Sequence, residues 1–225
     1  MNDEKLQHLL GLVVDQYIGK GEPIWSKFLN SLEDIEYAPS TLRKYLNVLE
    51  KEGLLYQPYN SSWRVPTVMW MSTYMNALLN LTEEEMENDE QFDLNYARKD
   101  LRSVVEMLGK IVDGAAVWFL KEDEYYALGI HNLVKESLVG DHELSRHLIK
   151  FVESKEVIQS LDAKMMKRNE VYYTILEQKE KMISIVYAKL EINGFDSVLS
   201  IIGPSRADHK KNISILKKLL EQASV

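Results

Sequence analysis

The sequence predicts an α+β protein in two parts, with three helices and a hairpin ahead of an antiparallel sheet flanked by helices. Three observations indicate this fold class. Apolar residues recur at helical spacing in the first 50 positions. Short strand-like runs separated by turn residues dominate the second half. Between the two parts lies an acidic stretch, residues 82–93, of the kind that forms a solvated boundary.

Three helices are predicted in the first part. The first ends near Gly19 and Gly21 and is indicated by six apolar residues at helical spacing, Leu6, Leu9, Leu10, Val13, Val14 and Tyr17. Pro23 opens a short second helix over Trp25–Leu32. The third begins at Pro39 and Ser40, carries Leu42, Leu46 and Leu49 on one face, and ends at Gly53, where a left-handed cap belongs.

Two strand-like runs follow the third helix, Leu54–Gln57 and Trp63–Val65, with turn residues between them. Three helices followed by a hairpin are the plan of a winged helix-turn-helix, in which the third helix enters the major groove of DNA. We therefore expect residues 1–67 to form a winged helix-turn-helix DNA-binding domain.

The rest of the chain is expected to contain a linker, residues 68–95, and a second domain, residues 96–225. The linker consists of a helix over Val68–Leu79 and the acidic stretch. The second domain mixes helices with an antiparallel sheet, the α+β arrangement. Its predicted helices are Leu101–Ile111, Asp141–Val152, Ser154–Lys167 and one near the C-terminus; its predicted strands are Ala115–Leu120, Tyr125–Ile130, Val171–Leu176, Ile183–Leu190 and Ser197–Ile202.

Composition narrows the possible functions. The 225 residues carry a net charge of −8, which argues against a protein that coats nucleic acid by bulk attraction. Cysteine is absent, so disulfides and thiolate metal sites are excluded. The charged N-terminus and the lack of a long apolar run predict a cytoplasmic protein with no membrane partner. His142 and His147 are five apart, off the spacing of paired helix ligands, and no catalytic motif occurs, so we expect no enzyme activity, metal or cofactor.

Several short motifs, in order and spacing, resemble the heat-inducible transcription repressor family, HrcA. Near the N-terminus they are Gly21-Glu22-Pro23-Ile24 followed by Ser26-Lys27, Ser40-Thr41-Leu42-Arg43, Leu49-Glu50, Gly53-Leu54-Leu55, Gln57-Pro58 and Arg64-Val65-Pro66-Thr67. Further on they are Tyr126–Leu133 and Ile202-Gly203-Pro204-Ser205-Arg206-Ala207-Asp208.

The resemblance implies a homodimer that binds an inverted-repeat operator in double-stranded DNA upstream of chaperone genes, with the chaperonin GroEL as a further partner. It also implies that the second domain is GAF-like. That domain usually carries an inserted dimerisation domain, but here a tight turn joins the strands between Ala115 and Leu133, so we expect the insertion to be missing. Lys44-Tyr45 replaces the family's Asn-Asp, and Trp25 and Trp63 replace glycines, which puts the operator sequence in doubt.

The expected DNA contacts lie on the second and third helices and the hairpin. Arg43 is the expected base reader, because arginine is the commonest guanine reader; its alternative is a surface arginine paired with Glu50 or Glu52. The other expected base or phosphate contacts are Ser26, Lys27, Ser40, Thr41, Lys44, Asn47 and Arg64.

Two other functions remain open from the sequence. One is a ligand-sensing transcription regulator. The other is a winged-helix module that binds protein and not DNA. The second is supported by the charge of the first 70 residues, which hold seven Lys and Arg against nine Asp and Glu, a net of −2.

Overall fold

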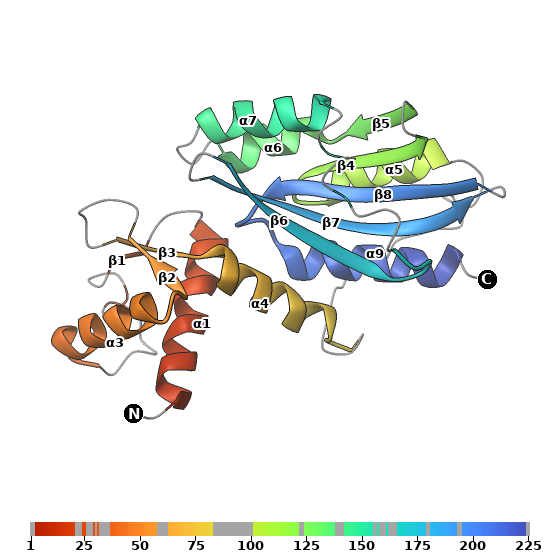
Figure 1. Ribbon diagram of the computed structural model, residues 1–225. Coiled ribbons are helices and arrows are strands. Elements are labelled where there is room, and N and C mark those ends of the chain that lie inside the picture. Colours follow the sequence, from red (N-terminus) through yellow and green to blue (C-terminus); the bar gives the residue numbers. More distant parts are fainter. Residues whose placement is uncertain are drawn as a thin grey trace. The chain divides into compact units, whose positions relative to one another are not determined.

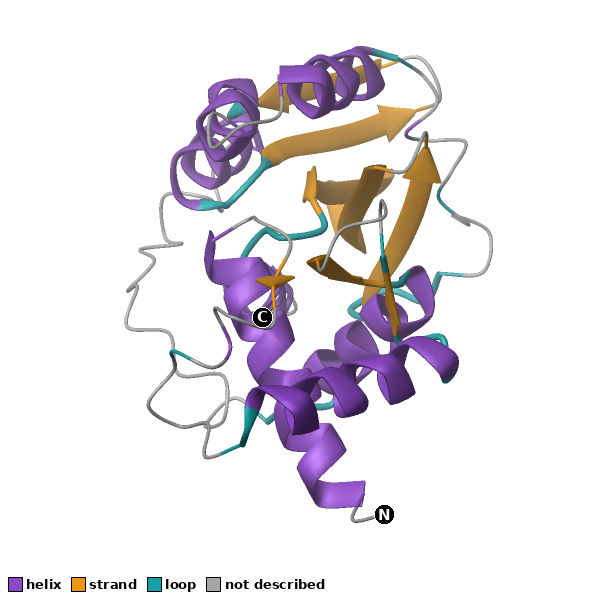
Figure 2. Ribbon diagram, turned by 90° about the vertical axis from the view of Figure 1, so that its left-hand side faces the viewer, coloured by secondary structure: helices purple, strands orange, loops and turns teal. Residues whose placement is uncertain are grey.

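The chain divides into two units, Met1–Tyr74 and Met75–Val225. The computed structural model describes residues 3–20, 24–25, 29, 31, 37–57, 63–82, 101–121, 124–137, 142–154, 157, 161, 166–178, 181–192 and 195–223. Both units contain helices and antiparallel strands, which can be followed in Figures 1 and 2. Within the described residues, no helix is both long and apolar enough to cross a bilayer.

The first unit packs two described helices against a small sheet. Its elements are α1 (Asp3–Lys20), β1 (Ile24–Trp25), α3 (Pro39–Lys51), β2 (Leu55–Tyr56) and β3 (Trp63–Pro66). The sheet has the order β1-β3-β2, with both pairs antiparallel. The buried core combines the apolar stripes of α1 and α3, including Leu9, Val13, Leu42, Leu46 and Leu49. The helical periodicity of the sequence therefore identifies the buried faces.

The second helix differs from the prediction at its start. Ile24 and Trp25 form strand β1, paired with Arg64 and Trp63 of β3, so a helix cannot begin at Trp25. Pairing with β3 is a long-range interaction that local periodicity does not report. Most of the predicted helix, with Ser26 and Lys27, lies outside the described residues; Leu29 is helical and fully buried.

Helix α3 ends as its sequence predicts. Gly53 adopts a φ of +73°, the left-handed conformation that costs glycine little. The amide of Gly53 donates to the Glu50 carbonyl and that of Leu54 to the Leu49 carbonyl, so the last turn of the helix has partners. The chain then reverses into β2.

Helix α4 (Val68–Leu79) has the bounds predicted for the connecting helix, and the boundary between the units falls within it. Most of the acidic stretch that follows lies outside the described residues. Within the second unit, the Lys217 ammonium donates to the carbonyls of Leu79 and Leu81 at 2.8 and 3.0 Å.

The second unit is a five-stranded antiparallel sheet with helices on both faces (Figure 1). Its strands, in the order β5-β4-β8-β7-β6, are β4 (Ala115–Lys121), β5 (Glu124–Leu128), β6 (Val171–Gln178), β7 (Lys181–Ile192) and β8 (Phe195–Pro204). Its helices are α5 (Leu101–Ile111), α6 (Ile130–Ser137), α7 (His142–Glu153) and α9 (His209–Ala223). This mixed α+β arrangement is consistent with a GAF-like domain.

Alternate strand residues face opposite layers of helices. Val117, Phe119, Ile183, Ile185 and Ile202 share one buried cluster with residues of α6 and α7. Their neighbours along the strands point to the other face, where α5 and α9 lie (Figure 1). A sheet covered on both faces explains the long apolar runs of β7 and β8.

Strands β4 and β5 form a direct hairpin. Their register runs from Ala116 opposite Leu128 to Lys121 opposite Glu124, so only residues 122 and 123 separate the strands. An inserted domain has no room in this connection, as the sequence predicts.

Two predicted segments of the second unit need correction. Residues 130–137 form helix α6, whereas the sequence predicts a strand that continues to Ile130. Of the predicted helix Ser154–Lys167, Val157 is helical, but Met166 and Lys167 are not, and Arg168 pairs with Lys189 in an isolated parallel bridge. Arg168 is thus paired with β7, and the predicted helix does not include Met166 and Lys167.

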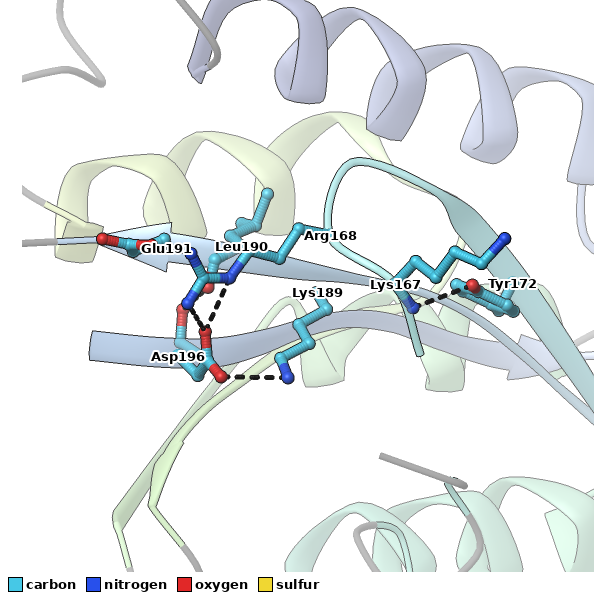
Figure 3. A network of polar contacts seen from close by, with 8 residues as sticks. Lys167, Arg168, Tyr172, Lys189, Leu190, Glu191 and Asp196 are labelled. Atoms are coloured by element: carbon cyan, nitrogen blue, oxygen red, sulfur yellow. Dashed lines mark hydrogen bonds and ion pairs between the residues drawn. The ribbon is translucent and has the colours of Figure 1, made fainter. Parts of the chain in front are cut away.

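Arg168 joins the start of β6 to the hairpin of β7 and β8 (Figure 3). Its guanidinium donates to Asp196 at 2.7 and 3.0 Å and forms an ion pair with Glu191. The Lys189 ammonium lies 2.9 Å from the other oxygen of Asp196. These donors, Lys189 foremost, hold the pKa of Asp196 below its ordinary value. The network ties three chain segments together at an exposed site.

Asn132 of α6 provides partners for the end of α5. Its Nδ2 donates to the carbonyls of Gly109, Val112 and Gly114 at 2.9, 3.2 and 3.1 Å. Gly129 allows the close approach, because it has a φ of +77° and a β-carbon there would lie 2.8 Å from the Gly109 oxygen. The motif Tyr126–Leu133 therefore has a structural role.

The motif Ile202–Asp208 forms the passage from β8 to α9. The Asp208 carboxylate accepts the amide of Lys211 at 2.9 Å and caps the helix. His209 follows, fully buried, with Nε2 2.7 Å from the Ser205 carbonyl. Burial lowers the pKa of His209 below its ordinary value, against the opposing effects of the Ser205 carbonyl and of Asp208.

Replacing Asn132 tests its contribution to the second unit. Asn132→Asp puts acceptors in place of the donor that serves three carbonyls, so the free energy of unfolding is expected to fall by about 2–3 kcal/mol. The matched control is His131→Ala, an exposed neighbour on α6, with an expected change within about 0.5 kcal/mol. Urea unfolding measures both, and equal effects in the two variants would contradict the role of Asn132.

His209 predicts a loss of stability in acid. The unfolded chain takes up a proton as the pH falls below 6.5, whereas the buried imidazole does so only at lower pH. Its contribution is therefore complete above pH 6.5 and is lost as the pH falls from there toward the folded pKa. Urea unfolding at pH 7.5 and 5.0 should show a larger decrease for the wild type than for His209→Gln; parallel decreases would refute the prediction.

Candidate nucleic-acid interface

Helix α3 exposes a continuous polar stripe opposite its leucine face. Leu42, Leu46 and Leu49 are each at most 2% exposed. Positions three, four or seven residues apart on the other side of the helix are exposed, and they carry Ser40, Arg43, Lys44, Asn47 and Lys51. Because the buried face is set by the core, these side chains have to share the outer face.

The stripe carries three positive charges, from Arg43, Lys44 and Lys51, and no acidic residue. Thr41 is half-buried and lies at its margin. A helix with one basic, hydrogen-bonding face suits phosphate and base-edge contacts in the major groove.

Tyr45 shows which of the two altered positions after Arg43 faces outward. Its ring lies 5.5 Å from that of Tyr37, edge to face, and both pack against the core of the unit. Lys44 is exposed. The change from the family's Asn-Asp to Lys44-Tyr45 therefore affects the outer face through Lys44.

Arg64 is placed differently from the other predicted contacts. It lies in the central strand β3 and is 9% exposed. One guanidinium nitrogen is 3.2 Å from Asn47 Oδ1 and 3.0 Å from a Glu50 carboxylate oxygen. The structure thus brings Asn47 and Arg64 together and adds Glu50, which the sequence suggested only as a partner for Arg43.

Glu50 could have been found from its spacing. It lies three residues after Asn47, which places both side chains on adjoining turns of α3. The sequence does not reveal the position of β3 beside α3. That position places Arg64 next to Asn47, which is 17 residues earlier in the chain.

Trp25 and Trp63, which stand where the family pattern has glycines, are partners in the register of β1 and β3. Both changes therefore fall at one place in the small sheet. Ser26 and Lys27, next to Trp25, lie outside the described residues.

Thr67, the last residue of the Arg64–Thr67 motif, caps α4. Its hydroxyl donates to the Gly53 carbonyl at 2.7 Å and accepts the amide of Trp70 at 3.2 Å. Its backbone amide donates to the Leu54 carbonyl. One threonine thus joins the end of α3, the start of β2 and the start of α4.

Comparison with known proteins decides the family. A sequence model described as the HrcA protein C-terminal domain matches residues 66–213. The chain belongs to the HrcA family.

Individual HrcA proteins match parts of the chain. The heat-inducible transcription repressor HrcA of Chromobacterium violaceum is 29% identical over 112 residues, 50% of this chain and 33% of that protein. The protein of the same name from Anabaena sp. strain L31 is 34% identical over 109 residues, 47% of this chain and 30% of that protein. The chain thus spans about a third of the length of these relatives.

The fold also occurs in a solved structure. A crystal structure of a hypothetical protein at 2.2 Å resolution is similar with a TM-score of 0.71 and 16% identity, over 100% of this chain and 98% of that one. The similarity confirms the α+β fold.

The Thr67 cap provides a test of the first unit. Thr67→Val keeps the shape but removes the hydroxyl, so the amide of Trp70 loses its cap and the free energy of unfolding should fall by about 1–2 kcal/mol. Thr67→Ser retains the hydroxyl and is the matched control, with a smaller loss. Thermal unfolding monitored by circular dichroism compares the two, and an equal loss would contradict the capping role of the hydroxyl, because the serine variant retains it.

Proposed function

We propose that this chain is a DNA-binding transcription repressor of the heat-inducible type named in its relatives. Its first unit is a winged helix-turn-helix, with α3 as the recognition helix and the hairpin of β2 and β3 as the wing. The second unit is a GAF-like regulatory domain. The protein acts in the cytoplasm and is not an enzyme.

The polar stripe of α3 is the observation that carries this proposal. Arg43 and Lys44 lie side by side on it, one turn from Asn47. Although the first 70 residues carry a net charge of −2, the outer face of α3 is locally positive, and phosphate contacts depend on charges within about a Debye length of 10 Å.

The family resemblance supports further elements of the proposal. The repressor binds as a homodimer to an inverted-repeat operator of chaperone genes, and GroEL modulates it. A two-fold dimer requires half-sites separated by a whole number of helical turns of DNA. Repression then follows from occupancy of the promoter.

Arg43→Ala tests the recognition helix. In a titration of the full chain against a duplex with the family's inverted repeat and against a scrambled duplex, the variant should lose about 1–3 kcal/mol of preference for the operator, the value of one base contact. Lys44→Ala should weaken binding to both duplexes and reduce the salt dependence by about one phosphate. The matched control is Arg146→Ala, an exposed arginine on α7, which should bind as the wild type does.

Three outcomes bear on the proposal. Operator-selective binding that Arg43→Ala removes supports it in full. Salt-sensitive binding to both duplexes alike keeps DNA as the partner and rejects the family's operator. Absence of salt-sensitive binding would reject DNA as the partner and favour a protein-binding winged helix.

A further inference from the structure

The wing arginine, Arg64, contacts the recognition helix from its buried side. A wing residue that binds phosphate has to be exposed, but Arg64 is 9% exposed and lies in the central strand of the small sheet. Its side chain is directed at Asn47 and Glu50 of α3. Arg64 is thus in contact with a residue of the proposed DNA-binding face without being on that face.

The contact determines which way the Asn47 carboxamide is turned. Arginine has donors and no acceptor, so the atom of Asn47 that lies 3.2 Å from it has to be the oxygen. The amide nitrogen is then the group left for a ligand. Asn47 is exposed, and no hydrogen bond joins this nitrogen to another residue in the described part of the chain.

The same guanidinium forms an ion pair with Glu50, an acidic residue on the same helix as Asn47. The Glu50 carboxylate is 3.0 Å from Arg64 and partly exposed, three residues beyond Asn47 on α3. Left unpaired, it would repel the phosphates of a bound duplex. The ion pair removes that repulsion where the helix meets DNA.

We propose that Arg64 is a positioning residue that sets the base preference of Asn47. Arg64 holds the Asn47 oxygen inward, and Asn47 donates a single bond from its nitrogen to an acceptor on a base edge in the major groove: N7 or O6 of guanine, N7 of adenine or O4 of thymine. A freely turning asparagine would instead pair with adenine, donating and accepting at once. This inference rests on the proposed DNA-binding function and adds to it the atom that reads the base.

The isosteric variant Asn47→Asp tests the two roles of the Asn47 carboxamide separately: accepting from Arg64 and donating to a base. An aspartate keeps an acceptor for Arg64, so the melting temperature should not decrease. It lacks the outward donor, so the full chain should lose its preference at one base pair of each half-site by about 5- to 140-fold, the discrimination of one base contact. The preference is measured by sequencing the duplexes that each variant retains from a library of randomised 30-base-pair DNA.

Arg64→Lys tests positioning against phosphate contact. Lysine keeps the charge but lacks the planar fork that holds two partners. If Arg64 acts through Asn47, this variant loses the same base preference, keeps the wild-type salt dependence, and causes no further loss when combined with Asn47→Ala. Lys44→Ala is the reference for the loss of one phosphate contact. For this variant the slope of log affinity against log salt concentration should be smaller in magnitude by about 0.9, and the base preference should be retained.

The inference is overturned if Asn47→Asp retains the base preference. It is also overturned if Arg64→Lys retains it while Arg64→Ala reduces the salt slope as Lys44→Ala does, because Arg64 would then be a phosphate contact. Should Arg64→Lys fail to fold, the Asn47→Asp result decides alone. A wild-type chain that enriches no sequence and shows no salt dependence rejects the proposed function itself, a result distinct from the other two.

Discussion

Helix ends impose a constraint that recurs through the described structure, because a helix leaves the backbone groups of its first and last turns without partners. The short motifs of the sequence lie where such groups are found. Gly53 turns the chain at the end of α3. Thr67 caps the start of α4, Asp208 caps the start of α9, and Asn132 serves the carbonyls at the end of α5. Thr67 and Asn132 also form hydrogen bonds to neighbouring elements, so the same side chains satisfy the helix ends and connect the elements.

Arg64 is constrained by the hydrogen-bonding needs of a buried charge. A guanidinium keeps its proton at any pH a protein tolerates, so a buried one needs partners that accept hydrogen bonds. Two of its partners, Asn47 and Glu50, come from α3. The leucines of α3 decide which side of the helix faces outward, and the arginine fixes one side chain at the edge of that face. The proposed DNA-binding face of α3 is thus positioned by the buried leucines and by Arg64, which lie behind this face and do not contact the DNA.

The second unit keeps a five-stranded sheet in which two neighbouring strands are joined by a very short connection. Strands β4 and β5 pair directly through the two-residue connection at 122 and 123. Since β5 is an edge strand, the length of this connection does not disturb β8, β7 or β6. Tyr126 and Leu128 of β5 remain 49% and 36% exposed. The core between β4 and helices α6 and α7 is formed from residues outside the hairpin turn.

The sequence by itself determined the elements whose signals are local. The bounds of α4 and α5, the cap at Gly53, the order of the predicted strands along the chain, and the outward placement of Arg43, Lys44 and Asn47 all follow from periodicity and turn residues. Thr41, expected on the same outer face, is half-buried. Tertiary structure alone decided the strand at Ile24–Trp25, the bridge at Arg168, and the burial of Arg64. Each of these depends on pairing between residues far apart in the chain. The local pattern of apolar and polar residues does not indicate which distant residues will pair.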